Sequence, residues 1–160
     1  MKNAIIILPA FVFLSACGTA DGELTAGNWK NTMTMTRFDI PGAPPAVAQR
    51  AQGMLGKGQS SEACMNAAQA RAGVRDFSSS MQQGDCKMED FTQGGGKMSG
   101  TMVCTGSSGF GAPEMKMDGS YAPDKVSMTL SGEVSDSKLP GGKANIEMTI
   151  VSERTGDCKS

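Results

Sequence analysis

The sequence predicts an α+β, mainly β domain: an antiparallel sheet of about six strands, with one or two short helices between strands 1 and 2. Apolar and polar residues alternate in several segments after residue 86, as they do in strands that bury one face. Turns rich in glycine or proline separate these segments at short intervals, which is typical of consecutive hairpins. We expect a meander whose apolar face is either curled on itself or covered by the helices, and periodicity alone leaves both arrangements open.

The first expected strand covers residues 29–40, and every second residue from Trp29 to Met35 falls on one face. Phe38 falls on the opposite parity although it is apolar. A β-bulge inserts one extra residue and so restores the parity of the residues after it. The pattern therefore predicts a bulge or bend near Arg37.

Two short helices are expected next, over residues 46–55 and 62–72. A serine just before the second helix would cap its N-terminus, and Cys64 would lie within that helix. Gly73 would end it, because glycine is the usual residue after a helix C-terminus. Residues 74–85 are then expected to form a loop.

The triple glycine later in the chain predicts the first hairpin. A turn centred on Gly95 places Cys86 opposite Cys104 and Met88 opposite Met102. Directly opposed side chains on a sheet have Cβ atoms about 4.5–5.5 Å apart, and the closest such pairs can form a disulfide. The register therefore predicts the bridge Cys86–Cys104.

The second hairpin and the last strand show the clearest alternation. The segment Ala122-Pro123-Asp124-Lys125 suits a type I turn with proline at its second position. Folding there gives three facing pairs on the apolar side: Tyr121 with Val126, Gly119 with Met128, and Met117 with Leu130. The last strand places Ala144, Ile146, Met148 and Ile150 on that same side.

The first 16 residues have the layout of a secretory signal peptide. Lys2 precedes an apolar run of about ten residues, and small residues follow. That run is shorter than the roughly 20 apolar residues of a membrane-spanning helix. The run ends in Leu14-Ser15-Ala16-Cys17, which resembles a bacterial lipobox, where the cysteine thiol is lipidated and the chain is cut before it. The alternative is an ordinary signal peptide cut near Ala16.

We expect three segments in the chain: a lipoprotein signal peptide over residues 1–16, a lipidated Cys17 with a tether over residues 17–26, and one disulfide-bonded domain over residues 27–158. The protein would sit on the periplasmic face of a membrane through the lipid on Cys17. The outer membrane is the preferred location, because the aspartate that favours retention at the inner membrane does not follow Cys17.

The cysteine count agrees with export. Without Cys17, four of the five cysteines remain, and an even number in an exported protein implies disulfides. If Cys86 pairs with Cys104, Cys64 pairs with Cys158 by elimination, and this bridge would join the second helix to the C-terminal strand. The spacing of these cysteines does not resemble the paired ligands of a zinc site.

Charge and composition argue against several functions. After residue 16 the chain has 14 Lys and Arg and 16 Asp and Glu, with no basic cluster, so we expect no nucleic-acid partner. The chain has no histidine, which removes Ser-His-Asp and Cys-His catalysis and the usual general base near neutral pH. We expect no enzyme activity and no cofactor.

Methionine is unusually frequent. After residue 16 the chain has 12 Met against 17 Ile, Leu, Val and Phe together, so the core must use methionine. A methionine-lined concave sheet could also accept a lipid tail or another apolar ligand. The candidate ligand-facing residues are Trp29, Met33, Met35, Met115 and Met117, although a sole tryptophan at a strand start is more often a core anchor. The four methionines form two Met-x-Met pairs, an alternative site for Cu(I).

Three short motifs indicate a family. They are Gly27-x-Trp29-x-x-Thr32, the series Cys64, Cys86 and Cys104, and the ending Arg154-x-Gly156-x-Cys158. Together they resemble the small proteobacterial periplasmic proteins grouped as domain of unknown function, family 3617, over roughly residues 24–158. The resemblance implies export and oxidised cysteines, and it supplies no catalytic residues.

The sequence therefore favours a non-catalytic binding or structural lipoprotein, with an apolar ligand or an envelope protein as its partner. A second hypothesis is an inhibitor of an envelope or host enzyme, because lysozyme inhibitors include small disulfide-bonded β-rich lipoproteins. Cu(I) binding through the Met-x-Met pairs is the third hypothesis.

Overall fold

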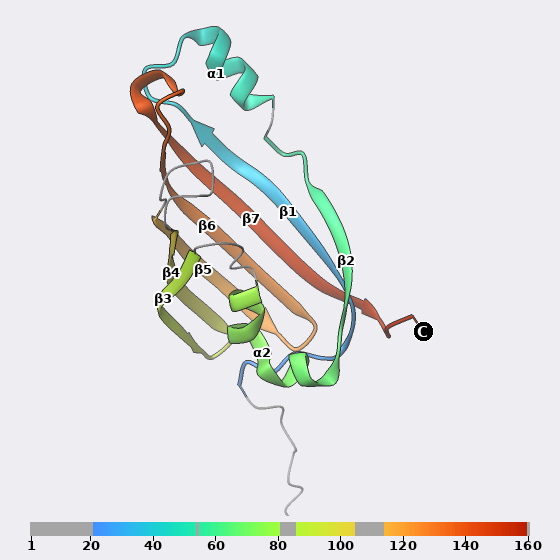
Figure 1. Ribbon diagram of the computed structural model, residues 1–160. Coiled ribbons are helices and arrows are strands. Elements are labelled where there is room, and N and C mark those ends of the chain that lie inside the picture. The colour runs from blue at the N-terminus through green and yellow to red at the C-terminus, as the bar shows by residue number, and fades with distance from the viewer. Residues whose placement is uncertain (1–20, 54, 81–85, 105–113, 160) are drawn as a thin grey trace, which may run out of the picture.

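The computed structural model describes residues 21–53, 55–80, 86–104 and 114–159. Its strands are β1 (Gly27–Asp39), β2 (Gln59–Met65), β3 (Cys86–Gly94), β4 (Lys97–Cys104), β5 (Glu114–Ala122), β6 (Lys125–Ser135) and β7 (Lys143–Gly156), and its helices are α1 (Pro45–Gln52), α2 (Ala67–Ser80) and the short 3₁₀ turn η1 (Pro140–Gly142). All strands form one antiparallel sheet in the order β2-β1-β7-β6-β5-β4-β3 (Figure 1). The expected mainly β fold with helices between its first strands is confirmed, with seven strands where about six were expected.

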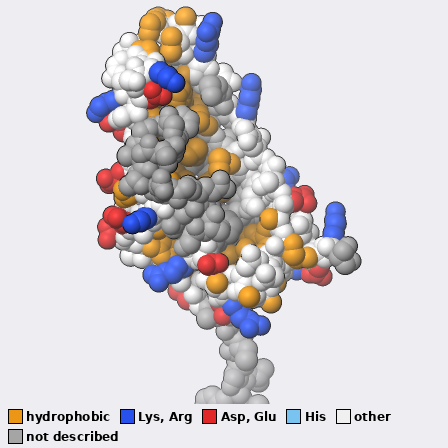
Figure 2. All heavy atoms as spheres, viewed as in Figure 1, with side chains coloured by type: hydrophobic (Ala, Val, Ile, Leu, Met, Phe, Trp, Pro, Cys, Tyr) orange, Lys and Arg blue, Asp and Glu red, His pale blue; other side chains and the backbone are white. Residues whose placement is uncertain are grey.

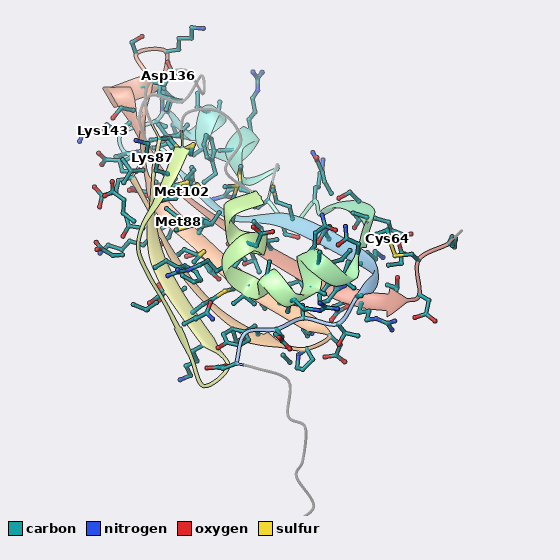
Figure 3. All side chains as sticks on the ribbon, turned by 60° about the horizontal axis from the view of Figure 1, so that its bottom comes forward. Cys64, Lys87, Met88, Met102, Asp136 and Lys143 are labelled. Atoms are coloured by element: carbon teal, nitrogen blue, oxygen red, sulfur yellow. A yellow bond between two sulfur atoms is a disulfide. The ribbon has the colours of Figure 1, made fainter. Side chains whose placement is uncertain are left out.

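The sheet is open and curved, and α2 lies across its inner side (Figures 1 and 3). We call this inner side the concave face and the opposite side the convex face. Ala70 and Val74 of α2 are buried against the concave face. Among the residues that the structure describes, ten buried ones form the main core: Leu24, Trp29, Val74, Met98, Met115, Met117, Val126, Met128, Leu130 and Ile150. The fold thus combines the two arrangements that periodicity left open, a curled sheet and a helix cover.

The expected helix over residues 62–72 is wrong in its first part, because residues 59–65 form the edge strand β2. This strand pairs with β1 along its whole length, and Cys64 lies on it opposite Asn28. Almost every residue of β2 is exposed. The strand therefore forms through backbone pairing with β1, a long-range interaction that local residue preferences do not reveal. The bridge from Cys64 accordingly joins a strand, and not a helix, to the C-terminal segment.

Helix α2 begins after Asn66 and is interrupted, not ended, at Gly73. The Asn66 Oδ1 accepts the N–H groups of Ala68 and Gln69, and the Gln69 Oε1 accepts the N–H of Asn66. This reciprocal pair satisfies the first free donors of the helix. At Gly73 the backbone has a φ of 71°, and the helix then resumes to Ser80. The loop expected over residues 74–85 is therefore wrong for residues 74–80, and residues 81–85 lie outside the described part.

Residues 21–26 do not form the free tether that the sequence suggested. Leu24 is buried in the core, and its N–H donates to the carbonyl of Ala70 at the break in α2. Asp21 accepts hydrogen bonds from the Tyr121 hydroxyl at 2.6 Å and from the Gly95 N–H at 3.2 Å. The first of these bonds raises the pKa of Tyr121 above its ordinary value. The chain is thus attached to the domain from residue 21 onward.

The register expected for the β5–β6 hairpin is confirmed, whereas that of the β3–β4 hairpin is confirmed at Cys86 and Met88 and is one residue off near its turn. In the β5–β6 pair, Tyr121 faces Val126 and Met117 faces Leu130. The β1–β7 pair shifts register between Met35 and Arg37, at the position of the expected bulge.

The β3–β4 hairpin aligns its two cysteines through a second bulge. Gly95 and Gly96 form its turn with φ angles of 57° and 75°, the positive values that a two-residue type I′ turn requires. Near that turn Gln93 faces Met98. If this register continued along the strands, Cys86 would face the residue after Cys104 and not Cys104 itself. A shift between Glu89 and Thr92 corrects it, so that Cys86 faces Cys104 and bonds to it.

Asp90 within this bulge provides a test of the hairpin. Its φ is 50°, in the left-handed region that aspartate tolerates better than branched residues do. We expect Asp90→Val to lower the free energy of unfolding by about 1–2 kcal/mol and Asp90→Gly to leave it nearly unchanged. Urea denaturation of the oxidised protein measures both, and an equal loss in the two variants would contradict the role of backbone conformation.

Candidate functional site

One side of β1 lines the concave face with four residues of different character. Trp29, Asn31, Met33 and Met35 alternate along the strand and all point to this face, since they lie opposite Arg154, Ser152, Ile150 and Met148 of β7. Trp29 is only 1% exposed, whereas Met33 is 47% exposed and Met35 is half-buried. The strand therefore runs from the core out to an open apolar surface.

Trp29 is a core anchor. Its indole Nε1 donates to the carbonyl of Thr25 at 3.0 Å, so that its one polar group is satisfied while the ring is buried. Of the ligand-facing candidates, Met115 and Met117 are also buried in the core, at 3% and 1% exposure. Of the five candidates, Met33 and Met35 are the two whose side chains offer accessible surface to a ligand.

The structure does not bring the two Met-x-Met pairs together. Met33 and Met35 lie on β1, Met115 and Met117 lie on β5, and two strands separate β1 from β5 in the sheet. Thioether ligands must meet at one ion to bind Cu(I). The four sulfur atoms therefore do not form one ligand set in this fold.

Further apolar side chains surround the open part of the concave face. Figure 2, which looks onto this side, shows hydrophobic side chains at the surface there. Half-buried residues that pack against the core include Met88, Met102, Ile146 and Met148. Met88 and Met102 face each other across the β3–β4 pair on one flank of α2 (Figure 3). Thioether side chains are flexible, so this surface can adapt to an apolar ligand.

A small pocket lies between α2 and the edge of the sheet, next to Met33. Its volume is about 170 Å³, and its lining comes from β1, β2 and α2: Trp29, Asn31, Ala63, Cys64, Met65, Gln69 and Asp76. Asn31 precedes Met33 on the same face of β1, so the pocket continues into the apolar surface. The Cys64 disulfide lies at the outer side of this region, near the C-terminal end of the chain (Figure 3).

Within the described part of the chain, two buried polar atoms beside this pocket have no hydrogen-bond partner. They are Asn31 Oδ1 and Ser152 Oγ, which belong to residues directly opposite each other on β1 and β7. Ser152 is completely buried. Leaving a buried polar atom without a partner costs about 1–3 kcal/mol, so such atoms are rare in native proteins. The described part of the fold therefore provides no hydrogen bond for these two atoms.

The sequence motifs at the two ends of the domain meet next to this pocket. Arg154 Nε donates to the carbonyl of Ala26 at 2.7 Å, and its guanidinium pairs with Asp157. Gly27 has a φ of 146°, and a side chain there would come within 2.3 Å of the Gly156 carbonyl. These motif residues thus build the corner that holds Trp29 in place, which is a structural role.

The convex face has a different character. A shallow hollow there is lined by both signs of charge, mainly Arg37, Lys116, Glu114, Glu133 and Glu147. Glu133 pairs with Lys143 at 2.7 Å, and both side chains are about half exposed. Interspersed exposed charges of this kind are typical of a solvated surface. We therefore place the candidate site on the concave face.

Three further observations limit the chemistry of the described residues. The ranges 21–53, 55–80, 86–104 and 114–159 contain no group of three or more acidic, cysteine or histidine side chains that could hold a metal ion. Within those same ranges, no helix is both long and apolar enough to cross a membrane. The lipidation site expected at Cys17 lies outside the described residues.

Sequence reasoning missed the polar residues of the site. Asn31 and Ser152 lie at positions of their strands where alternation predicts apolar, inward-facing residues. A polar residue at such a position could have indicated a buried polar site. Gln69 and Asp76 could not be placed, because they come to the pocket only through the true start of α2 and its kink at Gly73.

The fold and the site define a small disulfide-bonded domain in which an open, curved antiparallel sheet holds a helix and an adjoining apolar surface on its concave face. The chain belongs to the family described as Protein of unknown function (DUF3617), which it matches over residues 24–158. No curated protein and no solved structure matches the chain.

Proposed function

We propose that the protein is an exported, lipid-anchored binding module that holds an apolar ligand on its concave face and catalyses no reaction. The observation that carries this proposal is the exposure of Met33, at 47%, beside a buried apolar core. Contiguous apolar surface marks sites that bind a partner or a ligand, and Met33 adjoins other apolar side chains on the same face. Half-buried Met35 and Met148 extend this surface along the sheet.

The absence of histidine from the chain supports a role in binding rather than in catalysis. The candidate site agrees, because Met33 and Met35 form its apolar part and the described lining of the adjoining pocket contains one carboxylate, Asp76, and not a pair of acids or bases. An apolar ligand needs contact area and exclusion of water, and a flexible methionine surface supplies both.

Charge introduced at the open methionine tests the binding proposal. We expect Met33→Glu to weaken binding of dodecanol, an uncharged apolar probe, at least tenfold, because a carboxylate must lose its water to contact an alkyl chain. Thr34→Glu is the matched control, since Thr34 is the next residue on β1 and points to the convex face. Isothermal titration of the purified protein measures both affinities. Equal weakening in the two variants, or none in either, would contradict a site on the concave face.

Attachment of the protein to the periplasmic face of a membrane, with the outer membrane preferred, forms the second half of the proposal. The Leu14-Ser15-Ala16-Cys17 segment and the two disulfides support it, because disulfides persist in oxidising compartments. We expect Cys17→Ser to abolish incorporation of labelled palmitate and to move the protein from the membrane to the soluble fraction. A variant that stays labelled and membrane-bound would contradict anchoring at Cys17.

A further inference from the structure

The N-terminal segment is fixed to one end of the domain from Asp21 onward. The Asp21 carboxylate accepts the Tyr121 hydroxyl at 2.6 Å and the Gly95 N–H of the β3–β4 turn at 3.2 Å. Thr25 then donates its N–H to the Pro123 carbonyl in the β5–β6 turn at 2.6 Å. Both turns lie at the end of the sheet opposite α1 (Figure 1). We call this end, formed by the β3–β4 and β5–β6 turns, the turn end.

The chain between the expected lipidation site and the turn end is short. Residues 18–20 are the three that separate Cys17 from Asp21 in the sequence. An extended chain spans at most about 3.6 Å per residue, so the Cα atoms of Cys17 and Asp21 are at most about 14 Å apart. In a protein anchored through Cys17, the lipid chains enter the bilayer and Cys17 stays at its surface. The anchor would therefore hold the turn end close to that surface.

The two faces of the sheet are poorly suited to lie on a bilayer. Helix α2 crosses the concave face and has exposed polar side chains, among them Arg71, so a flat surface on that side would meet the helix before the sheet (Figure 3). The convex face carries exposed charges of both signs, including Lys125 paired with Glu153 at 2.6 Å. Transfer of such charges from water into an apolar layer is unfavourable. Contact through the turn end avoids this cost on both faces.

We propose that the domain contacts its own membrane through the turn end, so that a lipid surface is the partner of the β3–β4 and β5–β6 turns. This inference rests on the proposed lipid anchor at Cys17. Strand β1 begins near the turn end at Gly27 and runs away from it to Asp39 (Figure 1). At about 3.4 Å per residue, Met33 and Asp39 lie about 20 and 41 Å along the strand from Gly27. The open apolar surface is then held above the bilayer, and its ligand reaches it from the aqueous side.

The test is NMR of the isotope-labelled, lipidated protein in nanodiscs, in which some lipid headgroups carry a gadolinium chelate. The chelate broadens the signals of nearby amides, and this effect falls steeply with distance. We expect broadening at the backbone amides of Gly95 and Asp124 in the two turns, and several-fold less at Gln49 of α1 and Gly141 of η1. All four residues are exposed, which makes the two ends comparable. Equal broadening at both ends, or more at Gln49 and Gly141, would overturn the proposal.

A longer tether tests whether the short chain after Cys17 is the cause. Inserting about 16 Gly and Ser residues after Thr19 gives a flexible segment of about 20 residues, with a root-mean-square length of about 22–27 Å. We expect the broadening at Gly95 and Asp124 to fall several-fold and the difference between the two ends to shrink. The same segment added after Ser160 is the matched control and should leave the original pattern unchanged. An unchanged pattern with the longer tether would also overturn the proposal.

Mass spectrometry of the same sample separates this inference from the proposed function. If Cys17 carries no lipid, the anchor is wrong and the contact through the turn end fails with it. If Cys17 is lipidated and both ends are broadened equally, the anchor stands and the contact through the turn end alone is wrong. A lipidated Cys17 with broadening concentrated at the turn end would support both.

Discussion

Replacing Cys64 and Cys158 together by serine is expected to lower the free energy of unfolding by about 4–5 kcal/mol, since a cross-link between distant residues restricts the unfolded chain strongly. The two cysteines are 94 residues apart in sequence. The double replacement of Cys86 and Cys104, which are 18 residues apart, should cost about 3 kcal/mol on the same argument. Urea denaturation without reductant compares the two, and a greater loss for the shorter loop would contradict this order.

The location of the longer bridge predicts where its loss is felt first. Cys64 lies on the edge strand β2, whose residues are almost all exposed, so few apolar contacts hold this strand in place. In the oxidised protein, β2 is held by its backbone pairing with β1 and by the bridge to Cys158. Amide hydrogen exchange in the serine variant should therefore increase in β2 before it increases in the central strands β6 and β7.

Trp29→Ala is expected to cost about 3–5 kcal/mol of unfolding free energy, because it leaves a large cavity in the core. The ring is 1% exposed, and its loss also removes the donor to the Thr25 carbonyl. Trp29→Phe keeps part of the apolar volume and should cost less. Thermal and urea denaturation measure both variants.

The matched control for Trp29 is Met33→Ala, on the same strand and the same face. Met33 is 47% exposed, so truncation there removes little buried surface and should cost less than about 1 kcal/mol. Comparable losses at the two positions would contradict the division of β1 into a core segment and an open segment.

The parts of the fold that the sequence predicted are those determined by local turns. The Pro123-Asp124 turn fixes which residues of β5 and β6 face each other, and strict alternation on both strands allows one register only. The bulge near Arg37 was predictable because apolar residues change parity there. In the β3–β4 hairpin the expected pairing of Cys86 with Cys104 was right, although it depends on the bulge at Asp90, which alternation did not reveal.

The parts that the sequence did not predict depend on distant partners. Strand β2 has no alternation of its own and forms against β1, about 30 residues earlier. Gly73 was expected to end a helix, yet the N-terminal segment at Gly22 and Leu24 supplies hydrogen bonds on both sides of the break, so α2 continues. The same long-range packing brings Gln69 and Asp76 to the pocket.

Methionine explains why a small core can coexist with an open face. Four of the ten buried core residues are methionines: Met98, Met115, Met117 and Met128. Flexible side chains fill irregular space without the shape that branched residues require. The same residue type thus builds the core and continues into the accessible surface at Met33 and Met35.

The most direct test of a ligand site on the concave face is NMR of protein isotope-labelled at its backbone amides and at its methionine methyl groups, titrated with dodecanol. We predict larger shifts at the methyl groups of Met33 and Met35 than at the backbone amides of Thr34 and Lys116, whose side chains point to the convex face. Shifts at Thr34 or Lys116 while Met33 and Met35 stay unchanged, or no shifts at any methionine, would contradict the proposed site.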